Sequence, residues 1–222
     1  MRVIDLENIT VAMRDQTRFV LRCEEVFHDK ISAAASTILS AYPKRPYVAL
    51  TGPSGSGKTT TAMRLKAYLE NLGVPVCLLS MDNFFLSLAD RPKELTDWES
   101  PLCVNWTELC RCMEALSNGE TAQVPWYDFA GGKTGGTGIY VAPRTRIITG
   151  DDRIVRPEQI RVARRMIRDY RGRGNSLRTT VERAQDVDRG EVQYIAPNKP
   201  NASVHIDTFH DYEPCILAKY LN

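Results

Sequence analysis

The sequence lacks the features of a membrane, secreted or strongly charged protein. No apolar run approaches the roughly 18–20 residues that a bilayer-spanning helix needs, and the N-terminal stretch Met1–Glu7 contains acids where a signal peptide would be apolar. The formal net charge is only +2, so charge alone does not favour nucleic acid as a partner. We therefore expect a cytoplasmic protein with no membrane and no nucleic-acid partner.

Histidine is scarce, and the cysteines lack the spacing of a zinc site. The three histidines, His28, His205 and His210, show no catalytic-triad or metal-ligand spacing. Cys110 and Cys112 do not form the C-x-x-C pattern of zinc sites. Because no export signal is evident, we expect the six cysteines to be reduced thiols, and we expect ordinary packing and no metal for Cys110, Cys112 and the nearby Cys103.

The chain has no internal repeat and no low-complexity segment. The number of domains can therefore be estimated from its length. With 222 residues, 43% of them hydrophobic, it can bury a full core. We expect one structural domain overall, in which residues 1–46 form an N-terminal segment and helix packed on a main domain of residues 47–222.

The most informative segment is residues 47–61. A short apolar run, Tyr47–Thr51, leads into Gly52-Pro-Ser-Gly-Ser-Gly-Lys-Thr59, and a helical pattern follows at once. This G-x-x-x-x-G-K-T motif between a strand and a helix is typical of a phosphate-binding P-loop. The alternative is a Gly/Ser-rich turn that fits the motif by chance, and the strand-like and helical flanks count against it. The segment therefore predicts a nucleoside triphosphate site.

Each part of the motif has a physical task. Gly52, Gly55 and Gly57 permit backbone conformations that turn successive N–H groups toward one anion. Lys58 can reach the β- and γ-phosphates, and the Thr59 hydroxyl can bind Mg²⁺. The residues expected to contact ATP are Gly52, Pro53, Ser54, Gly55, Ser56, Gly57, Lys58, Thr59 and Thr60.

The pattern around the motif predicts an α/β fold. Ala62, Leu65, Leu69 and Leu72 recur at helical spacing before Gly73, and the apolar run Val74–Met81 follows as a strand covered on both faces. Strand, helix and strand in this order form a βαβ unit. We expect a three-layer P-loop NTPase-type fold with a parallel sheet.

Further elements are indicated along the chain. Apolar spacing predicts helices from about Cys23 to Tyr42, after the capping residue Asn105, after Pro157, and from Pro214 to Leu221, with short strands at Gly138–Ala142 and Ser203–Ile206. The helix after Pro157 has an expected buried stripe of Ile160, Ala163, Ile167 and Tyr170. Its adjoining faces carry Arg161, Arg164, Arg165, Arg168 and Arg171.

Two features could carry chemistry beside the P-loop. Asp82 ends the second predicted strand, where the carboxyl ends of parallel strands line a ligand crevice. Its carboxylate could take a proton from a hydroxyl, hold Mg²⁺ through water, or simply cap a turn. The arginine-rich helix could form a lid that stabilises a transferred phosphoryl group, or present a solvated basic face.

Two loop segments combine aromatic and acidic side chains, Asp97–Ser100 and Pro125–Phe129. Such groups could stack on a nucleobase and hydrogen-bond to a ribose diol. They could equally pack locally, so the sequence leaves both interpretations open.

Taken together, these stretches resemble the uridine kinase-like P-loop kinases of the uridine kinase/phosphoribulokinase family. The resemblance runs from about Glu25 and is strongest to bacterial uridine kinase-like proteins that often carry a TGS domain. The matching stretches are Gly52–Thr59, Ser80–Phe85, Asp97–Ser100, Val124–Phe129, Arg164–Gly174, Arg189–Ile195 and Asn201–Val204.

The resemblance implies roles for individual residues. Asp82 would activate the acceptor hydroxyl, Glu99 would hold the ribose hydroxyls, and Tyr127 would lie by the nucleobase. Arg164, Arg168 and Arg173 match the lid arginines that contact phosphates. Phe85 belongs to the acceptor-side motif, and Lys133 occupies the region where uridine kinases place a base-reading histidine.

The sequence departs from the family in two places. Gly131, Gly132 and Lys133 stand where that histidine is expected, which leaves pyrimidine specificity open. Between Phe129 and Ile154 no apolar strand ends in Glu-Gly, so the Walker B-like element is absent from the sequence. Asp151 or Asp152 could replace its carboxylate, although a surface turn fits them better.

The sequence therefore predicts a kinase that uses ATP and Mg²⁺ to phosphorylate a hydroxyl of a small molecule, with the 5′-hydroxyl of a nucleoside favoured. Two alternatives stay open. One is a degenerate nucleotide-binding protein with a regulatory role, and the other is a kinase of a non-nucleoside alcohol or sugar phosphate. The family often forms homo-oligomers, but no sequence feature identifies an interface.

Overall fold

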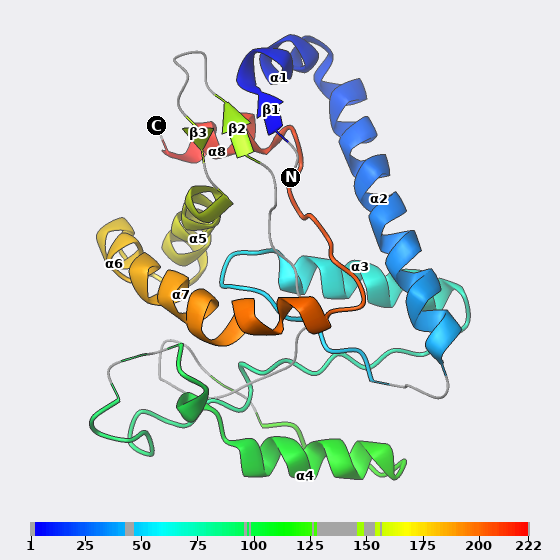
Figure 1. Ribbon diagram of the computed structural model, residues 1–222, viewed down its shortest axis with the longest axis vertical. Helices are drawn as coiled ribbons and strands as arrows, with labels where there is room; N and C mark the ends of the chain where they lie inside the picture. Colours follow the sequence, from blue (N-terminus) through cyan, green and yellow to red (C-terminus); the bar gives the residue numbers. More distant parts are fainter. Residues whose placement is uncertain are drawn as a thin grey trace.

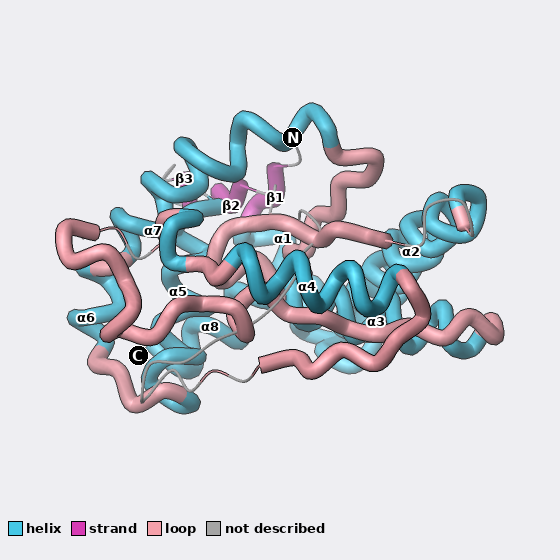
Figure 2. Tube along the Cα trace, turned by 90° about the horizontal axis from the view of Figure 1, so that it is seen from below, coloured by secondary structure: helices cyan, strands magenta, loops and turns pink. Residues whose placement is uncertain are grey.

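The computed structural model describes residues 3–42, 47–95, 97, 99–125, 127, 146–148, 154–155 and 157–221 (Figure 1). Most regular structure in these ranges is helical, and three short strands gather at one place (Figure 2). No helix in the described ranges is both long and apolar enough to cross a membrane.

The main core forms between α2 (Gln16–Ala41) and α3 (Lys58–Asn71). The inward face of α2 contributes Phe27 and Ile31, and α3 contributes Leu65 and Leu69. This confirms the two predicted helices and most of their apolar faces. Leu72 is an exception, because it lies beyond the last turn of α3 and is exposed.

A second apolar cluster forms on α4 (Trp106–Ser117), which lies at the opposite end of the molecule from the strands (Figure 1). Asn105 caps α4 as predicted, because its side chain accepts a hydrogen bond from the Glu108 amide at 3.1 Å. Leu109 and Cys112 pack on the buried Phe84. The loop that carries the predicted acceptor residues is thereby attached to this cluster.

The arginine-rich helix is α5 (Pro157–Gly172), which begins at Pro157 as predicted. Tyr170, expected to be buried, is 66% exposed, whereas its neighbour Asp169 is 2% exposed. The prediction of a continuous apolar stripe was wrong here, because the last turns of α5 bury a charged network instead of a hydrophobic face.

The rest of the chain adds short helices. The α5 helix is followed by α6 (Leu177–Glu182), α7 (Ala184–Gly190), a π-helical turn η3 (Glu191–Ile195) and a 3₁₀ segment η4 (Ala196–Asn201). The predicted closing helix is α8 (Glu213–Leu221). The N-terminal part contains α1 (Leu6–Ala12) and the 3₁₀ turn η1 (Met13–Asp15), and η2 (Pro101–Cys103) precedes α4.

The observed sheet differs from the predicted one. Its strands are β1 (Val3–Asp5), β2 (Arg146–Ile148) and β3 (Ile154–Val155), in the order β1-β2-β3. β1 pairs with β2 in parallel and β2 with β3 antiparallel. None of these strands was predicted, since runs of two or three residues carry no detectable period.

The strands predicted at 47–51 and 74–81 are not formed in the described structure. Both segments are non-helical, and Leu50 forms only a single bridge. In the second run, Val74 and Val76 pack against the main core and Leu79 and Met81 pack against the α4 cluster, while Cys77 and Leu78 are exposed. An apolar run specifies burial, but a strand also needs a neighbour in register to bond its backbone.

Two further strand predictions have different outcomes. At 203–206 only Ile206 forms a bridge, although its side chain is buried in the main core as an inward-facing residue would be. The strand predicted at Gly138–Ala142 lies outside the described residues, as do Gly131, Gly132, Asp151 and Asp152.

Candidate active site

The predicted P-loop joins the extended 47–51 segment to the start of α3. Gly55 and Gly57 have φ values of +79° and +86°, a region that side chains other than glycine rarely adopt. A Cβ at Gly55 would lie 2.8 Å from the backbone oxygen of Arg161. Both glycines are therefore required, by backbone conformation at each and by close packing against α5 at Gly55.

The Lys58 side chain folds back onto the P-loop itself. Lys58 Nζ donates to the backbone oxygens of Gly52 and Pro53 at 2.6 and 3.0 Å. Burial lowers the pKa of Lys58, and the nearby carboxylates of Asp82 and Glu99 oppose this shift. The ammonium group thus lies against the anion-binding loop with acidic groups close by.

The loop opens onto a cavity of about 670 Å³. The sequence-predicted residues that line it are Gly52, Pro53, Ser54, Gly55, Ser56, Gly57, Lys58, Thr59, Thr60, Asp82, Phe85, Glu99, Tyr127, Arg164, Arg168 and Arg173. Lys133 lies outside the described residues. Every other site residue expected from the sequence therefore borders one space, although these residues span more than half the chain.

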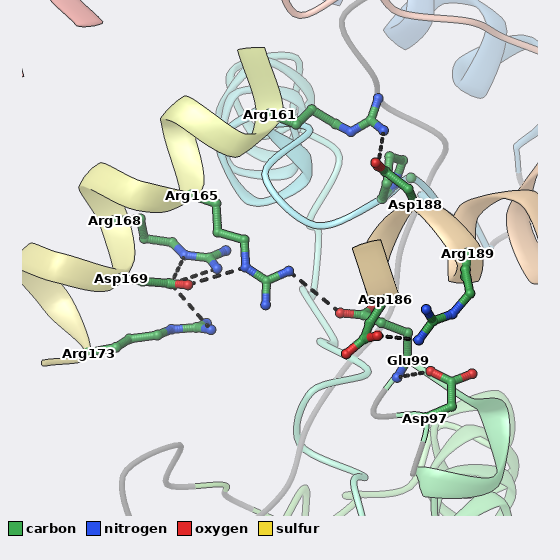
Figure 3. Close-up of polar contacts among 12 residues, drawn as sticks. Asp97, Glu99, Arg161, Arg165, Arg168, Asp169, Arg173, Asp186, Asp188 and Arg189 are labelled. Atoms are coloured by element: carbon green, nitrogen blue, oxygen red, sulfur yellow. Dashed lines mark hydrogen bonds and ion pairs between the residues drawn. The ribbon is translucent and has the colours of Figure 1, made fainter. Parts of the chain in front are cut away.

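Two arginines of α5, together with Arg173 just beyond its end, gather around a residue that sequence reasoning missed. Asp169 accepts a hydrogen bond from Arg168 Nε at 2.8 Å and one from Arg165 Nε at 3.3 Å, and Arg173 lies 3.8 Å away (Figure 3). A buried carboxylate of this kind is stable only beside compensating cations. The flanking arginines at i−4, i−1 and i+4 are the sequence signal that could have identified it.

The pKa of the Arg173 guanidinium is lowered within this cluster. Burial lowers its pKa, the positive charge of Arg168 lowers it further, and Asp169 and Asp82 oppose the change. The cluster therefore holds several cations close together at the cavity wall, an arrangement that an anionic ligand would stabilise.

Arg164 is engaged differently from the other lid arginines. Its Nη2 donates to Glu213 Oε2 at 2.7 Å and to the Thr208 backbone oxygen at 2.9 Å, and its Nη1 donates to the Gly55 backbone oxygen at 3.3 Å. These contacts connect α5, the start of α8 and the P-loop. In this structure, Arg164 holds the phosphate-binding loop in place through the protein itself.

The side of the cavity where the sequence predicts acceptor contacts is organised around Glu99. Its carboxylate lies 3.8 Å from Arg165 Nη1, and its amide donates to Asp97 Oδ1 at 3.0 Å (Figure 3). Burial raises the pKa of Glu99, whereas Arg165 and Lys58 oppose that rise. A carboxylate in this setting can accept hydrogen bonds from hydroxyl groups.

An aromatic pair lies on the same side. The rings of Phe85 and Tyr127 meet edge to face with centroids 6.0 Å apart. Arg91 lies over the Phe85 ring at 5.6 Å and donates to the Tyr127 hydroxyl at 3.1 Å. Sequence reasoning missed Arg91, because nothing in its local pattern distinguishes it from a loop arginine.

The donor groups available for Mg²⁺ are oxygens. Thr59 and Asp82 both border the cavity, and the Ser56 hydroxyl is buried without a hydrogen-bond partner among the described residues. No group of three or more His, Cys, Asp and Glu side chains in the described ranges could hold a metal alone. This set fits Mg²⁺, which commonly takes one or two protein oxygens and completes its shell with phosphates and water.

The loop geometry and the cavity define a P-loop kinase, and comparisons with known proteins agree. The family model described as "Phosphoribulokinase / Uridine kinase family" matches residues 47–149. The uridine kinase of Brevibacillus brevis is 30% identical over 72% of this chain and 83% of its own length. That of Halalkalibacterium halodurans is 29% identical over 73% and 86%. The chain belongs to the phosphoribulokinase/uridine kinase family.

A solved structure supports the fold. The crystal structure of a candidate fructose transport system kinase from Silicibacter sp. superposes with a TM-score of 0.56, covering 75% of this chain and 94% of that one. At 24% identity this likeness concerns architecture alone. The P-loop NTPase-type fold expected from the sequence is therefore confirmed, whereas the parallel sheet stays a prediction.

Proposed function

We propose that this protein transfers the γ-phosphoryl group of ATP to a hydroxyl of a small acceptor, and that the acceptor is a nucleoside with a reactive 5′-hydroxyl. The observation that carries the proposal is the convergence on one cavity of the P-loop, the Asp82 carboxylate, the arginines of α5 and the wall of Glu99, Phe85 and Tyr127. The related uridine kinases support a nucleoside acceptor.

On the donor side, the loop amides and Lys58 would hold the β- and γ-phosphates. Thr59, with Asp82 through water, would hold Mg²⁺, which neutralises charge on the phosphates when it is bound. Arg168 and Arg173, already gathered at Asp169, would stabilise the charge that develops on the transferred group.

On the acceptor side, Glu99 would accept hydrogen bonds from the sugar hydroxyls, and the Phe85–Tyr127 pair would pack against the base. Asp82 would take the proton from the attacking hydroxyl. A bond then forms between the hydroxyl oxygen and the γ-phosphorus while the bond from that phosphorus to the β–γ bridging oxygen breaks. ADP leaves, and the proton passes from Asp82 to solvent.

The second candidate is a kinase of a non-nucleoside alcohol or sugar phosphate. Arg91 favours it, because its guanidinium lies over Phe85 and adds a cation to the aromatic wall. A regulatory protein without turnover is the third, favoured by the missing Glu-Gly element.

One assay separates these candidates. ADP release with Mg²⁺ is measured across uridine, cytidine, other nucleosides, fructose, sugar phosphates and no acceptor, with Lys58→Ala as the control. Nucleoside-dependent release that the control abolishes is the expected result. Release with sugars alone selects the second candidate, and ATP binding without any acceptor-dependent release selects the third.

A further inference from the structure

The end of α7 makes an unusually close approach to the acceptor side of the cavity. Gly190 is buried, and a Cβ placed on it would lie 2.8 Å from Glu99 Cβ and 3.5 Å from Glu99 Cγ. Real Cβ atoms essentially never come so close, so any larger residue at 190 must displace either the loop that carries Glu99 or α7 itself.

The backbone does not explain this glycine. Gly190 has φ −60° and ψ −39°, an ordinary right-handed helical conformation that any residue adopts. Glycine within a helix lowers helix stability relative to alanine. Because conformation does not require glycine here, the space beside Glu99 is the reason that remains.

Glu99 is held from two directions at this place. On one side Arg165 of α5 lies 3.8 Å from its carboxylate. On the other, Tyr194 of η3 donates from its hydroxyl to Asp97 at 3.3 Å, and Asp97 in turn accepts from the Glu99 amide. The α7–η3 segment thus forms the wall against which the Asp97–Glu99 turn rests, and Gly190, Tyr194 and Glu99 all border the cavity.

We infer that Gly190 is a positioning residue for the acceptor, because it sets how far the Glu99 carboxylate extends into the cavity. It thereby controls the affinity for a hydroxyl-bearing acceptor without changing the affinity for ATP. The inference rests on the proposed function, in which Glu99 binds acceptor hydroxyls. Hydrogen bonds to hydroxyls depend steeply on distance and angle, so a displacement of a fraction of an ångström weakens them.

The test compares Gly190→Ala with Gly172→Ala, which adds the same methyl group at the end of α5 where no atom lies within 4 Å. Steady-state kinetics are measured with the acceptor that the wild-type protein uses. We expect Gly190→Ala to raise the acceptor KM about tenfold or more, with the ATP KM unchanged. The thermal midpoint should fall, because the added methyl group overpacks a buried contact. Gly172→Ala should leave both KM values at the wild-type level.

A double-variant cycle shows whether the effect passes through Glu99. In a Glu99→Ala background the carboxylate is already gone, so adding Gly190→Ala should not raise the acceptor KM further. A purely structural effect of the methyl group would instead persist in that background. Should Gly190→Ala not fold, Tyr194→Phe removes the other support of the turn and should raise the acceptor KM alone.

The outcomes are distinguishable. If the wild-type protein shows no acceptor-dependent ADP release, the proposed function fails and this inference fails with it. If the wild-type protein does show acceptor-dependent ADP release, three results overturn only the inference. The acceptor KM of Gly190→Ala equals that of the wild type, its ATP KM rises by the same factor as its acceptor KM, or its effect on the acceptor KM is as large in the Glu99→Ala background as in the wild type. An unchanged acceptor KM in a Tyr194→Phe protein would overturn it when Gly190→Ala does not fold.

Discussion

Arg164 and Glu213 form a two-pronged ion pair that joins α5 to the start of α8, with both side chains only 15% exposed. Because Arg164 also donates to the Gly55 backbone oxygen, this pair connects the C-terminal helix to the phosphate-binding loop. The position of the P-loop therefore depends on residues more than a hundred positions away in the sequence.

Breaking this pair should destabilise the protein. Glu213→Gln leaves a largely buried guanidinium without its counter-charge, and we expect the free energy of unfolding to fall by about 3 kcal/mol. Denaturant unfolding monitored by circular dichroism measures the change. Glu182→Gln is the matched control, because it breaks an exposed pair with Arg178 and should change stability by less than about 1 kcal/mol. Equal losses in the two variants would contradict the prediction.

Asp169 does not line the cavity, but we expect it to affect turnover through the arginines that it holds. Asp169→Asn removes the charge that holds Arg165, Arg168 and Arg173 together, so mutual repulsion should turn the guanidinium groups away from one another. We expect kcat to fall by about one to two orders of magnitude, the range for losing a preorganised electrostatic contact. Asp90→Asn, at an exposed turn, should have no effect. A folded Asp169→Asn protein with wild-type kcat would rule this role out.

Asp82 should control chemistry and not donor binding. Asp82→Asn keeps the size of the side chain and removes the proton acceptor, so we expect kcat to fall about 10²- to 10⁴-fold. ATP affinity, measured by calorimetry, should stay nearly unchanged because the P-loop is intact. Equal losses in turnover and in ATP affinity would show that Asp82 acts mainly on donor binding.

His210 should make stability depend on pH. Burial lowers the pKa of His210 below its ordinary value of 6.5, with Arg164 and Arg64 adding to the shift and Glu24 and Glu213 opposing it. Between the lowered pKa and 6.5 the unfolded chain binds more protons than the folded protein. The free energy of unfolding therefore rises with pH through this window, and the contribution is lost as pH falls through the folded-state pKa.

Thermal unfolding between pH 5 and 8 measures this dependence. His210→Gln should flatten the profile below pH 6.5, whereas His28→Gln, at an exposed position of α2, should keep the wild-type slope. A slope that survives in His210→Gln would assign the dependence to other groups.

Several local features follow from the sequence because they depend on neighbours along the chain. The P-loop bend needs glycines with positive φ at positions 55 and 57, two residues apart, and the α4 cap needs only Asn105 and the amide of Glu108. The inward faces of α2 and α3 follow from helical spacing in the same way.

Pairing between strands could not be predicted as reliably. The apolar run at 74–81 shows the composition of a covered strand, and most of its large side chains pack on the two apolar clusters, yet its backbone pairs with no neighbouring strand in the described structure. Strand formation depends on a partner elsewhere in the chain, and the residues that would supply one are not identified by local pattern.

The sequence by itself determined the P-loop, because the motif and its flanks are contiguous, and the resemblance to the family indicated the other residues that border the cavity. Tertiary structure alone decided how those residues are held. Asp169 accepts contacts from several arginines, Arg164 pairs with Glu213, and Gly190 leaves room for Glu99 at the cavity. The physical reason is that buried charge pairing and the contact of two surfaces depend on distances across the fold, which one-dimensional spacing does not contain.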